Sequence, residues 1–359
     1  MKKEKIVLGM SGGVDSSVAA ILLQKKGFEV YGVFMKNWDD KNAICNAEDD
    51  YADAVSVCNQ LNIPLKKINY TKEYKDRVFS QFLDDHKNGF TPNPDVLCNK
   101  EIKFDVFQKY AKQIGATKIA SGHYAKIVKE NDNFFISKAS DRTKDQSYFL
   151  YQLKSSLLHN IEFPLGSLLK KDIRKIAEEN NLVNASKKDS TGICFIGDRK
   201  YNDFVCQFLK TKKGKIITVD GEEIGHHDGH MYFTVGQRKG LGIGARNSAF
   251  DKPWYVVNKD INKNIVYVAQ GGTHPALFSD QLLADNMYWS RDISKLLPFK
   301  CNAKVRYRDE DHSCQILSSN EDKCYIKFDN KIKAITNGQS IVLYDEDGIC
   351  IGGGIIRKR

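Results

Sequence analysis

Residues Ser11–Ser17, with the sequence SGGVDSS, have the composition of a loop that binds phosphate groups. Glycines let the backbone approach a ligand closely, and serine hydroxyls and the free N–H groups of a helix N-terminus donate hydrogen bonds to phosphate oxygens. The loop is not a Walker A loop, because it lacks the G-x-x-x-x-G-K-[ST] spacing and its lysine. Transfer of a γ-phosphoryl group is therefore disfavoured, and a loop that holds a departing pyrophosphate is the better interpretation.

Two of the nine cysteines stand in contexts that favour chemistry. Asn93-Pro94 is typical of an N-cap followed by the first helical residue, which places Cys98 near the first turn of a helix. There the helix dipole and Lys100 would lower the pKa of the thiol below its usual ~8.5. Asp95 is close enough in sequence to orient a substrate or take a proton. Cys194, in DSTGICFIG (189–197), fits a buried strand cysteine as well as a nucleophile.

The other cysteines are expected to be packing residues or bystanders, among them Cys45, Cys58 and Cys206. No C-x-x-C pair is present, so neither a zinc ribbon nor a thioredoxin-type site is supported. The run from His226 to His230 (HHDGH) is dense in metal-ligand types, but its glycine breaks a helical i,i+4 arrangement. We interpret that run as a solvated turn and expect no dedicated metal site.

Residues 1–204 alternate apolar runs of strand length with segments of helical periodicity. We expect strands at Lys5–Met10, Glu29–Met35, Leu65–Asn69 and Lys118–Ser121, and helices at Ser16–Lys26, Glu48–Leu61, Lys72–His86 and Glu101–Ile114. This alternation predicts an α/β domain with a parallel sheet and helices on both faces. Ligands of such sheets bind at the carboxyl ends of the strands, where the Ser11–Ser17 loop lies.

Short β-rich runs replace helical periodicity in the second part of the chain. They lie at residues 213–220, 254–257, 265–268, 303–307, 325–328 and 340–344, with Gly, Asn and Asp turns between them. We therefore expect a catalytic domain at residues 1–204, a small β-rich central domain at 205–279 and a C-terminal β-barrel at 280–359.

The composition is that of a soluble globular protein, with 41% hydrophobic and 28% charged residues. The formal net charge of +10 suits a polyanionic partner without requiring one. No apolar run approaches the roughly 18–20 residues that cross a bilayer. The apolar stretch Ile6–Met10 is also too short for a signal peptide. We expect a cytoplasmic protein that does not bind membranes.

SGGVDSS after a strand resembles the signature of the ATP pyrophosphatase superfamily, whose members cleave ATP between the α- and β-phosphates. Further strings resemble, in order, the tRNA-specific 2-thiouridylase family of that superfamily. They are FMKNW (34–38), TPNPDVLCNKEIKF (91–104), SGHY (121–124), KDQSYFL (144–150), DSTGICFIG (189–197), GQRKGLGIG (236–244), KVRYR (304–308), GQS (338–340) and GGGII (352–356). The resemblance covers essentially the whole chain and implies an adenine nucleotide alpha hydrolase-like catalytic domain.

The resemblance implies a mechanism. ATP adenylates the C2 oxygen of the wobble uridine in tRNA for Lys, Glu and Gln, and pyrophosphate is released. Cys194 carries the incoming sulfur as a persulfide, and Cys98 is the partner nucleophile. Cys98 either frees a sulfide equivalent or resolves the persulfide through a transient Cys98–Cys194 disulfide. Asp95 is the acid/base candidate. The sulfur donor is a cysteine desulfurase or a relay protein, Mg²⁺ accompanies ATP, and the family expectation is a monomer.

The resemblance also assigns binding residues. ATP would contact Gly9, Met10, Ser11, Gly12, Gly13, Val14, Asp15, Ser16, Met35 and Gly122, although a methionine that ends a strand is usually a core residue. The tRNA would contact Asn93, Pro94, Asp95, His123, Lys144, Asp145, Gln146, Arg306, Tyr307 and Gln339. On a strand, Lys304, Arg306 and Arg308 would place three cations on one face, although an exposed strand with charged outer residues is the alternative.

Two other functions compete with this interpretation. A different pyrophosphate-releasing ligase, such as an amide-forming synthetase, would need neither Cys98 nor Cys194 and would not use tRNA. A non-catalytic RNA-binding protein with a relic nucleotide fold would not need the SGGVDSS loop or either cysteine motif.

Overall fold

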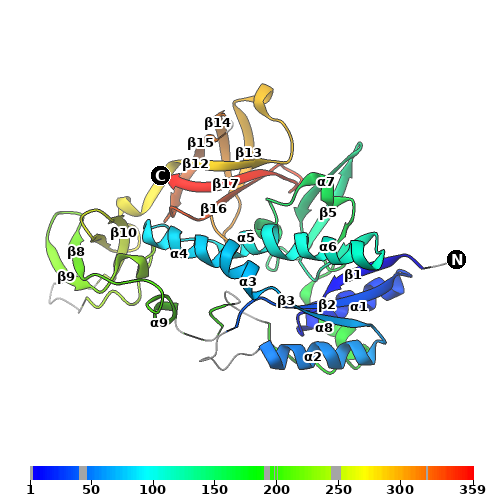
Figure 1. The fold of residues 1–359 in the computed structure, drawn as a ribbon. Coiled ribbons are helices and arrows are strands. Elements are labelled where there is room, and N and C mark those ends of the chain that lie inside the picture. The colour runs from blue at the N-terminus through cyan, green and yellow to red at the C-terminus, as the bar shows by residue number, and fades with distance from the viewer. Residues whose placement is uncertain are drawn as a thin grey trace. The chain divides into compact units, whose positions relative to one another are not determined.

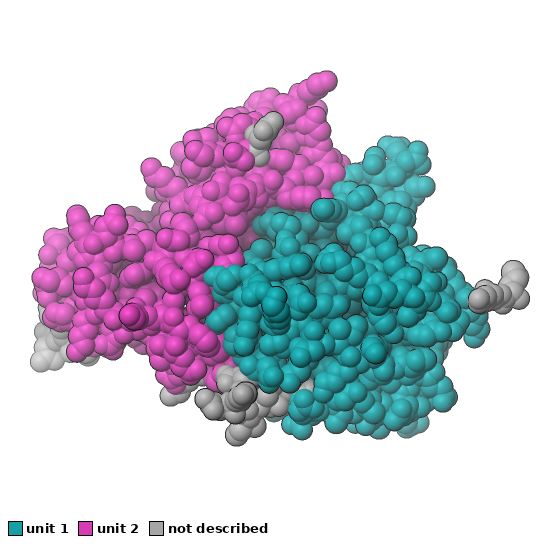
Figure 2. All heavy atoms as spheres, in the orientation of Figure 1, with its two compact units in different colours: residues 1–80, 94–198, 346–351 teal, residues 81–93, 199–345, 352–359 magenta. Residues whose placement is uncertain are grey.

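The structure is a computed structural model that describes residues 3–39, 47–189, 195–197, 199, 201–243, 252–320 and 322–359. The chain forms two compact units, coloured separately in Figure 2. Unit 1 consists of residues 1–80, 94–198 and 346–351, and unit 2 of residues 81–93, 199–345 and 352–359. Among the described residues, no helix has both the length and the apolar character that crossing a bilayer requires.

Unit 1 is built on a five-stranded sheet in the order β3-β2-β1-β4-β7, and all of its neighbouring strands are parallel. Leu8 in the central strand lies opposite Gly32 on one side and Ala120 on the other. The predicted parallel sheet is therefore confirmed. The strands are β1 (Lys5–Gly9), β2 (Glu29–Lys36), β3 (Leu65–Asn69), β4 (Lys118–Ala120) and β7 (Ile161–Glu162).

Helices cover both faces of this sheet, as expected, with α6 on one side and α1 and α8 on the other (Figure 1). Ile6 and Leu8 point into the core that α1 and α8 share. Gly9 faces α6, where an added Cβ would lie 2.5 Å from the ring of Phe107. The unit 1 helices include α1 (Val14–Lys25), α2 (Ala47–Gln60), α3 (Thr71–Tyr74), η1 (Lys75–Phe79), α5 (Pro94–Leu97), η2 (Cys98–Lys103), α6 (Phe104–Ile114), η3 (Ser147–Phe149), α7 (Ser155–Leu158) and α8 (Lys170–Glu179).

The strand order reverses between β1 and β4, because the chain runs from β1 outward to β3 and then returns to the other side of β1. In parallel α/β sheets this switch point opens a crevice at the carboxyl ends of the two strands. The Ser11–Ser17 loop follows β1, and Gly122 follows β4. An antiparallel hairpin of β5 (Ala125–Glu130) and β6 (Asn133–Lys138), absent from the sequence prediction, comes next in the chain.

Unit 2 contains a four-stranded sheet in the order β10-β11-β8-β9 and a closed barrel in the order β12-β15-β14-β13-β16-β17. Ile216, Val256, Val266 and Val268 fill the core of the sheet. The predicted C-terminal barrel is confirmed. The elements are α4 (Ser80–Lys87), α9 (Tyr201–Val205), β8 (Gly214–Thr218), β9 (Glu223–His227), η4 (His230–Tyr232), β10 (Trp254–Asp260), β11 (Ile265–Gln270), η5 (Pro275–Leu277), β12 (Phe278–Trp289), η6 (Ser294–Leu296), β13 (Phe299–Lys304), β14 (His312–Ser319), β15 (Lys323–Lys333), β16 (Ser340–Tyr344) and β17 (Cys350–Lys358).

Two predictions for this unit are wrong. Lys304, Arg306 and Arg308 do not alternate on one strand, because β13 ends at Lys304 and Arg308 has a left-handed φ of 65°. The HHDGH run is not a solvated turn, because His227 is 5% exposed and belongs to β9.

Candidate active site

The phosphate loop is held in shape by its own serines. The Ser16 hydroxyl donates to the Gly13 carbonyl at 2.9 Å and accepts the Ser11 N–H at 3.2 Å. The Ser17 hydroxyl also donates to the Gly13 carbonyl, at 3.1 Å. These bonds shape the turn into the N-terminus of α1, where N–H groups without intrahelical partners face a ligand.

Two glycines let other segments approach this loop. Gly12 has a φ of +76°, and an added Cβ would lie 2.1 Å from the carbonyl oxygen of Asp50 in α2. A Cβ on Gly122 would lie 3.1 Å from the backbone of Asp15 and Ser16. The structure therefore brings Gly122 against the loop, as the sequence analysis expected of an ATP site.

Other predicted ATP residues are available only in part. Met10 and Val14 are 2% and 3% exposed, so their side chains belong to the core. The Met10 N–H donates to the Val33 carbonyl at 2.9 Å. Met35 lies one residue before the end of β2 and is half-buried, so its side chain is more accessible than that of Met10.

An ion-pair cluster adjoins the loop. Lys170 Nζ lies 2.7 Å from Asp15 Oδ1 and 2.7 Å from Asp189 Oδ1. Asp189 also accepts hydrogen bonds from Lys144 at 2.8 Å and Arg174 at 2.9 Å. Burial opposes ionisation of Asp189, but the bonds from Lys144 and Lys170 prevail and lower the pKa of that carboxyl to about 2.

Tyr124 completes the contacts of Asp15, since its hydroxyl donates to Asp15 Oδ1 at 2.7 Å. Burial, and then the negative charge of Asp15, raise the pKa of Tyr124. The phenol therefore stays protonated and donates to the carboxylate. The Tyr124 hydroxyl and the Lys170 ammonium group thus fix the orientation of the Asp15 side chain at the first turn of α1.

Cys98 lies in a continuous helical stretch formed by α5, η2 and α6. Pro94 is the first residue of α5, as predicted, and Cys98 begins the π-helical turn η2. Asp95 precedes Cys98 by three residues, a spacing that places both on one helix face. Cys98 is buried, with 7% of its surface exposed.

A polar chain runs on from this helix. Burial raises the pKa of Asp95 above its usual 3.8, and the positive charge of Lys103 opposes that shift. Lys103 Nζ lies 3.3 Å from His123 Nε2, and His123 Nδ1 lies 2.6 Å from the Ser121 hydroxyl. An ammonium group only donates, so we assign the ring proton to Nδ1. Burial, and then Lys103, hold the pKa of His123 well below 6.5, so its ring is neutral at pH 7.

The predicted tRNA contacts at residues 144–146 differ in accessibility. Lys144 is half-buried and donates to Asp189. Asp145 is 3% exposed, and its carboxylate accepts from the Ala139 N–H at 2.9 Å and the Ser147 hydroxyl at 2.9 Å, so its side chain is occupied inside unit 1. Gln146 accepts the Tyr124 N–H at 3.0 Å.

Cys194, and with it the predicted Cys98–Cys194 disulfide, lies outside the described residues. Its neighbour in sequence, Phe195, is 1% exposed and lies in an aromatic cluster of unit 1. The ring centroid of Phe195 is 5.3 Å from that of Phe79 and 5.5 Å from that of Trp38. Asp189 and Phe195, on either side of the 190–194 segment, are therefore both fixed in unit 1.

In unit 2, the predicted tRNA residues Arg306 and Gln339 make internal hydrogen bonds. Arg306 donates to the carbonyls of Lys333 at 3.1 Å and Ala334 at 2.6 Å. The Gln339 amide donates to the Thr91 carbonyl at 2.9 Å. Tyr307 is half-buried, in the turn after β13.

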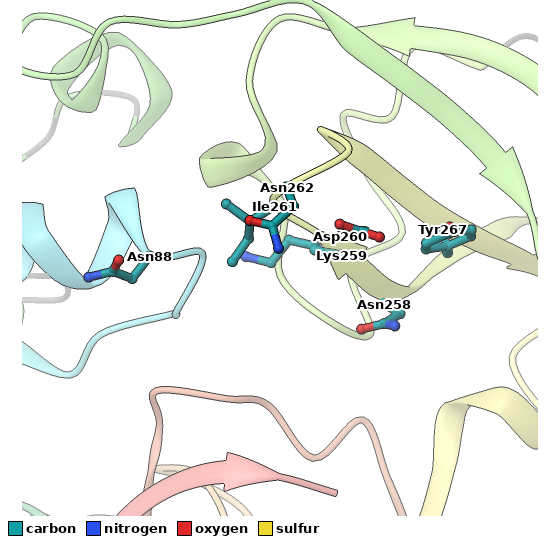
Figure 3. A pocket seen from close by; sticks show the side chains of 7 residues that line it. All are labelled: Asn88, Asn258, Lys259, Asp260, Ile261, Asn262 and Tyr267. Atoms are coloured by element: carbon teal, nitrogen blue, oxygen red, sulfur yellow. The ribbon is translucent and has the colours of Figure 1, made fainter.

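A cavity of 620 Å³ lies in unit 2. Figure 3 shows Asn88 at the end of α4 and, on the other side, the β10–β11 residues that line it. None of the predicted site residues is among its lining. The candidate active site is therefore the Ser11–Ser17 loop with the unit 1 residues around it, and not this cavity.

Comparison with known proteins covers the whole chain. Three domain profiles match: "tRNA methyl transferase HUP domain" at residues 4–198, "tRNA methyl transferase PRC-barrel domain" at 202–270 and "Aminomethyltransferase beta-barrel domain" at 279–356. The tRNA-specific 2-thiouridylase MnmA 1 of Geobacillus kaustophilus is 51% identical over 99% of this chain and 96% of its own length. The MnmA proteins of Legionella pneumophila (strain Lens) and Bacillus subtilis are 50% and 49% identical over 99% and 98% of this chain, and 99% and 94% of their own lengths. The chain belongs to the tRNA-specific 2-thiouridylase family.

Several residues around the loop of this thiouridylase family member were not predicted from the sequence. Lys170 and Tyr124 bind Asp15 across 155 and 109 positions of sequence. Asn184 is 4% exposed and donates to the Gly12 carbonyl at 2.9 Å. Only Tyr124 had a local signal, since it ends the SGHY string. The others become visible only when the fold brings them to the loop.

Proposed function

We propose that this chain is an ATP-dependent sulfurtransferase that converts the wobble uridine of tRNA for Lys, Glu and Gln to 2-thiouridine. The observation that carries the proposal is its likeness to tRNA-specific 2-thiouridylases over 98–99% of its length. The phosphate loop at the switch point of the unit 1 sheet supports it independently. The expected domains at 1–204, 205–279 and 280–359 are part of this proposal.

The first step is adenylation of the uridine. Its C2 oxygen attacks the α-phosphorus of ATP, the bond to the β-phosphate oxygen breaks, and pyrophosphate leaves. The oxygen at C2, a poor leaving group, is thereby made part of AMP. Ser11, Gly12, Gly13 and Ser16 fit the triphosphate, because the loop combines a left-handed glycine with hydroxyls at the start of α1. Mg²⁺ is expected to arrive with ATP, coordinated by its phosphates.

The second step delivers sulfur. Cys194 carries it as a persulfide received from a cysteine desulfurase or a relay protein. In the direct route the terminal sulfur attacks C2 and AMP leaves. The Cys98 thiolate then attacks Cys194 Sγ, which breaks the bond between Sγ and the transferred sulfur and leaves that sulfur on C2. A Cys98–Cys194 disulfide then forms, and a thiol reductant must restore both cysteines before the next cycle. In the other route Cys98 attacks Cys194 Sγ first, which forms the same disulfide and frees a sulfide. The sulfide then attacks C2 and displaces AMP.

Asp95 is our acid/base candidate, because it shares a helix face with Cys98 and burial raises its pKa above the usual value. We propose that Asn93, Pro94 and Asp95 contact the flipped uridine. The wider tRNA surface would involve His123, Lys144, Asp145, Gln146, Arg306, Tyr307 and Gln339. A net charge of +10 favours such a partner.

The test is a reconstituted reaction. Purified protein, ATP, Mg²⁺, a persulfide source and unmodified lysine tRNA are incubated, and the digested RNA is analysed for 2-thiouridine by mass spectrometry. Cys98→Ser and Cys194→Ser are run in parallel. Cys206→Ser is the matched control, because Cys206 is an exposed free thiol.

We expect thiouridine, AMP and pyrophosphate from the wild type and from Cys206→Ser, and no thiouridine from the other two variants. Thiouridine from Cys98→Ser or Cys194→Ser would leave the reaction standing and remove that cysteine from it. ATP cleavage without thiouridine would instead mean that the substrate is not this tRNA.

A further inference from the structure

Lys170 is a cation at the phosphate loop that the loop sequence itself lacks. We propose that Lys170 is a catalytic residue that binds the pyrophosphate leaving group during adenylation. This inference rests on the proposed function and adds a residue to it. It answers the question raised by the missing Walker lysine, because the fold supplies a lysine from 155 positions further along the chain.

The position of Lys170 is fixed at both ends of its side chain. It is the first residue of α8, and its backbone N–H donates to Asp141 Oδ2 at 2.9 Å. Its ammonium group lies 2.7 Å from Asp15, the second residue of α1. The side chain is 14% exposed, so few other positions are open to it. A triphosphate held by the loop would therefore meet this ammonium group.

The ion pairs near the loop distinguish Lys170 from the neighbouring cations. Three cations, Lys144, Lys170 and Arg174, share the two carboxylates of Asp15 and Asp189. Of these three cations, Lys170 is the one whose ion pairs include a residue of the loop, since the recorded pairs of Lys144 and Arg174 are with Asp189. Lys170 is therefore the cation placed to exchange a carboxylate oxygen for a phosphate oxygen.

The chemistry needs such a group. When the uridine oxygen bonds to the α-phosphorus, the electron pair of the breaking P–O bond moves to the β-phosphate oxygen, and the leaving pyrophosphate gains negative charge. An ammonium group fixed beforehand at that oxygen stabilises the transition state more than the ground state. Removing one such donor lowers kcat by roughly 10²–10³-fold in well-studied enzymes.

A purely structural role is the competing explanation, in which Lys170 only fastens Asp189 to unit 1. The two explanations predict different effects of these substitutions on pyrophosphate binding. If Lys170 only fastens Asp189, then Asp189→Asn and Lys170→Met should behave alike. If Lys170 binds the leaving group, only Lys170→Met should weaken pyrophosphate binding strongly.

The experiment compares Lys170→Met, Lys170→Arg, Asp189→Asn and the control Lys171→Met, which removes an exposed lysine one position along α8. Pyrophosphate binding to each free protein is measured by calorimetry, and tRNA-dependent AMP formation is measured separately. We expect Lys170→Met to bind pyrophosphate at least tenfold more weakly and to form AMP roughly 10²–10³-fold more slowly. Lys170→Arg, which keeps the charge, should recover part of both.

The proposal would be overturned if the pyrophosphate affinity of Lys170→Met lay within twofold of that of Lys171→Met. It would also be overturned if Asp189→Asn lost as much pyrophosphate affinity as Lys170→Met. If Lys170→Met fails to fold, Lys170→Arg is compared with Lys171→Met instead. Equal pyrophosphate affinity and equal rates of AMP formation in these two variants would count against the proposal. A wild type that binds pyrophosphate but makes no thiouridine would sink the proposed function. The binding comparison would still decide the role of Lys170.

Discussion

The side-chain amide of Gln339 donates a hydrogen bond to the backbone carbonyl of Thr91 at 2.9 Å. It also reaches the carbonyl of Pro92, at 3.4 Å. Pro92 directly precedes Asn93-Pro94-Asp95 in the chain, the segment proposed to contact the uridine. Gln339 therefore holds Thr91 and Pro92, which lead into that segment, before any RNA binds.

This contact predicts an effect of Gln339→Ala in the free protein. Loss of the amide leaves two partly buried carbonyl acceptors without this donor, at a cost of about 1 kcal/mol for the main bond. Amide hydrogen exchange of Phe90, Thr91 and Asn93 should rise in the absence of tRNA. The control is Gln281→Ala, which removes an exposed glutamine of β12 and should change neither the stability nor the amide hydrogen exchange. If exchange rises only when tRNA is present, Gln339 acts on the RNA alone.

Gly12 predicts a sharp difference between two glycine substitutions. Gly12 and Gly27 both have positive φ, of +76° and +92°, so alanine is strained at each by about 1–2 kcal/mol. A Cβ on Gly12 would also lie 2.1 Å from the Asp50 carbonyl, whereas nothing lies within 4 Å of one on Gly27. Gly12→Ala should therefore abolish ATP use, and Gly27→Ala should lower only Tm. Equal KM values for ATP in the two variants would contradict this account.

Much of unit 1 could be predicted from local pattern. The strands at Lys5–Gly9 and Leu65–Asn69 were found because apolar runs of strand length alternate with helical periodicity. The hairpin of Ala125–Glu130 and Asn133–Lys138 was missed, because it interrupts a parallel α/β pattern with an antiparallel pair. Its turn uses Asn131 at a φ of 52°, a residue type that tolerates this conformation.

The candidate site also contains features that the sequence predicts and features that it does not. The phosphate loop and the Pro94 helix start carry their signals in adjacent residues, so sequence was sufficient. The error at Lys304–Arg308 arose because period-two alternation cannot show that the strand ends at Lys304 and that Arg308 takes a left-handed φ. The contact of Lys170 with Asp15 depends on how α8 packs on α1, a tertiary relation with no local signal.

Asp189 predicts a pH-dependent contribution to stability. Its pKa is lowered from 3.8 to about 2. A depressed carboxyl pKa stabilises the fold above the unfolded value and loses that contribution as pH falls through the folded value. Asp189→Asn should therefore lower stability at pH 7, and its difference from wild type should shrink between pH 4 and pH 2. Thermal unfolding across this range measures it, with Asp132→Asn at the exposed β5–β6 turn as control. If the stability difference between Asp189→Asn and wild type does not change with pH, the ion pairs of Asp189 are not its cause.

Asp95 predicts opposite effects on stability and rate. Its pKa is raised above 3.8 by burial, so its stabilising contribution is present at low pH and is lost as pH rises through the folded value. Asp95→Asn, which carries no charge to bury, should therefore unfold at a higher temperature than wild type at pH 7. If Asp95 transfers a proton, the same variant should lose roughly 10²–10⁴-fold in kcat.

The pH profile of kcat/KM then identifies the direction of that transfer. A limb that rises with pH marks Asp95 as a base, a limb that falls marks it as an acid, and the limb should be absent from Asp95→Asn. Asp105→Asn, a partly exposed carboxylate of α6, is the control and should keep the wild-type profile. If Asp95→Asn keeps the limb and most of the rate, proton transfer belongs to another group, and Asp95 only contacts the base.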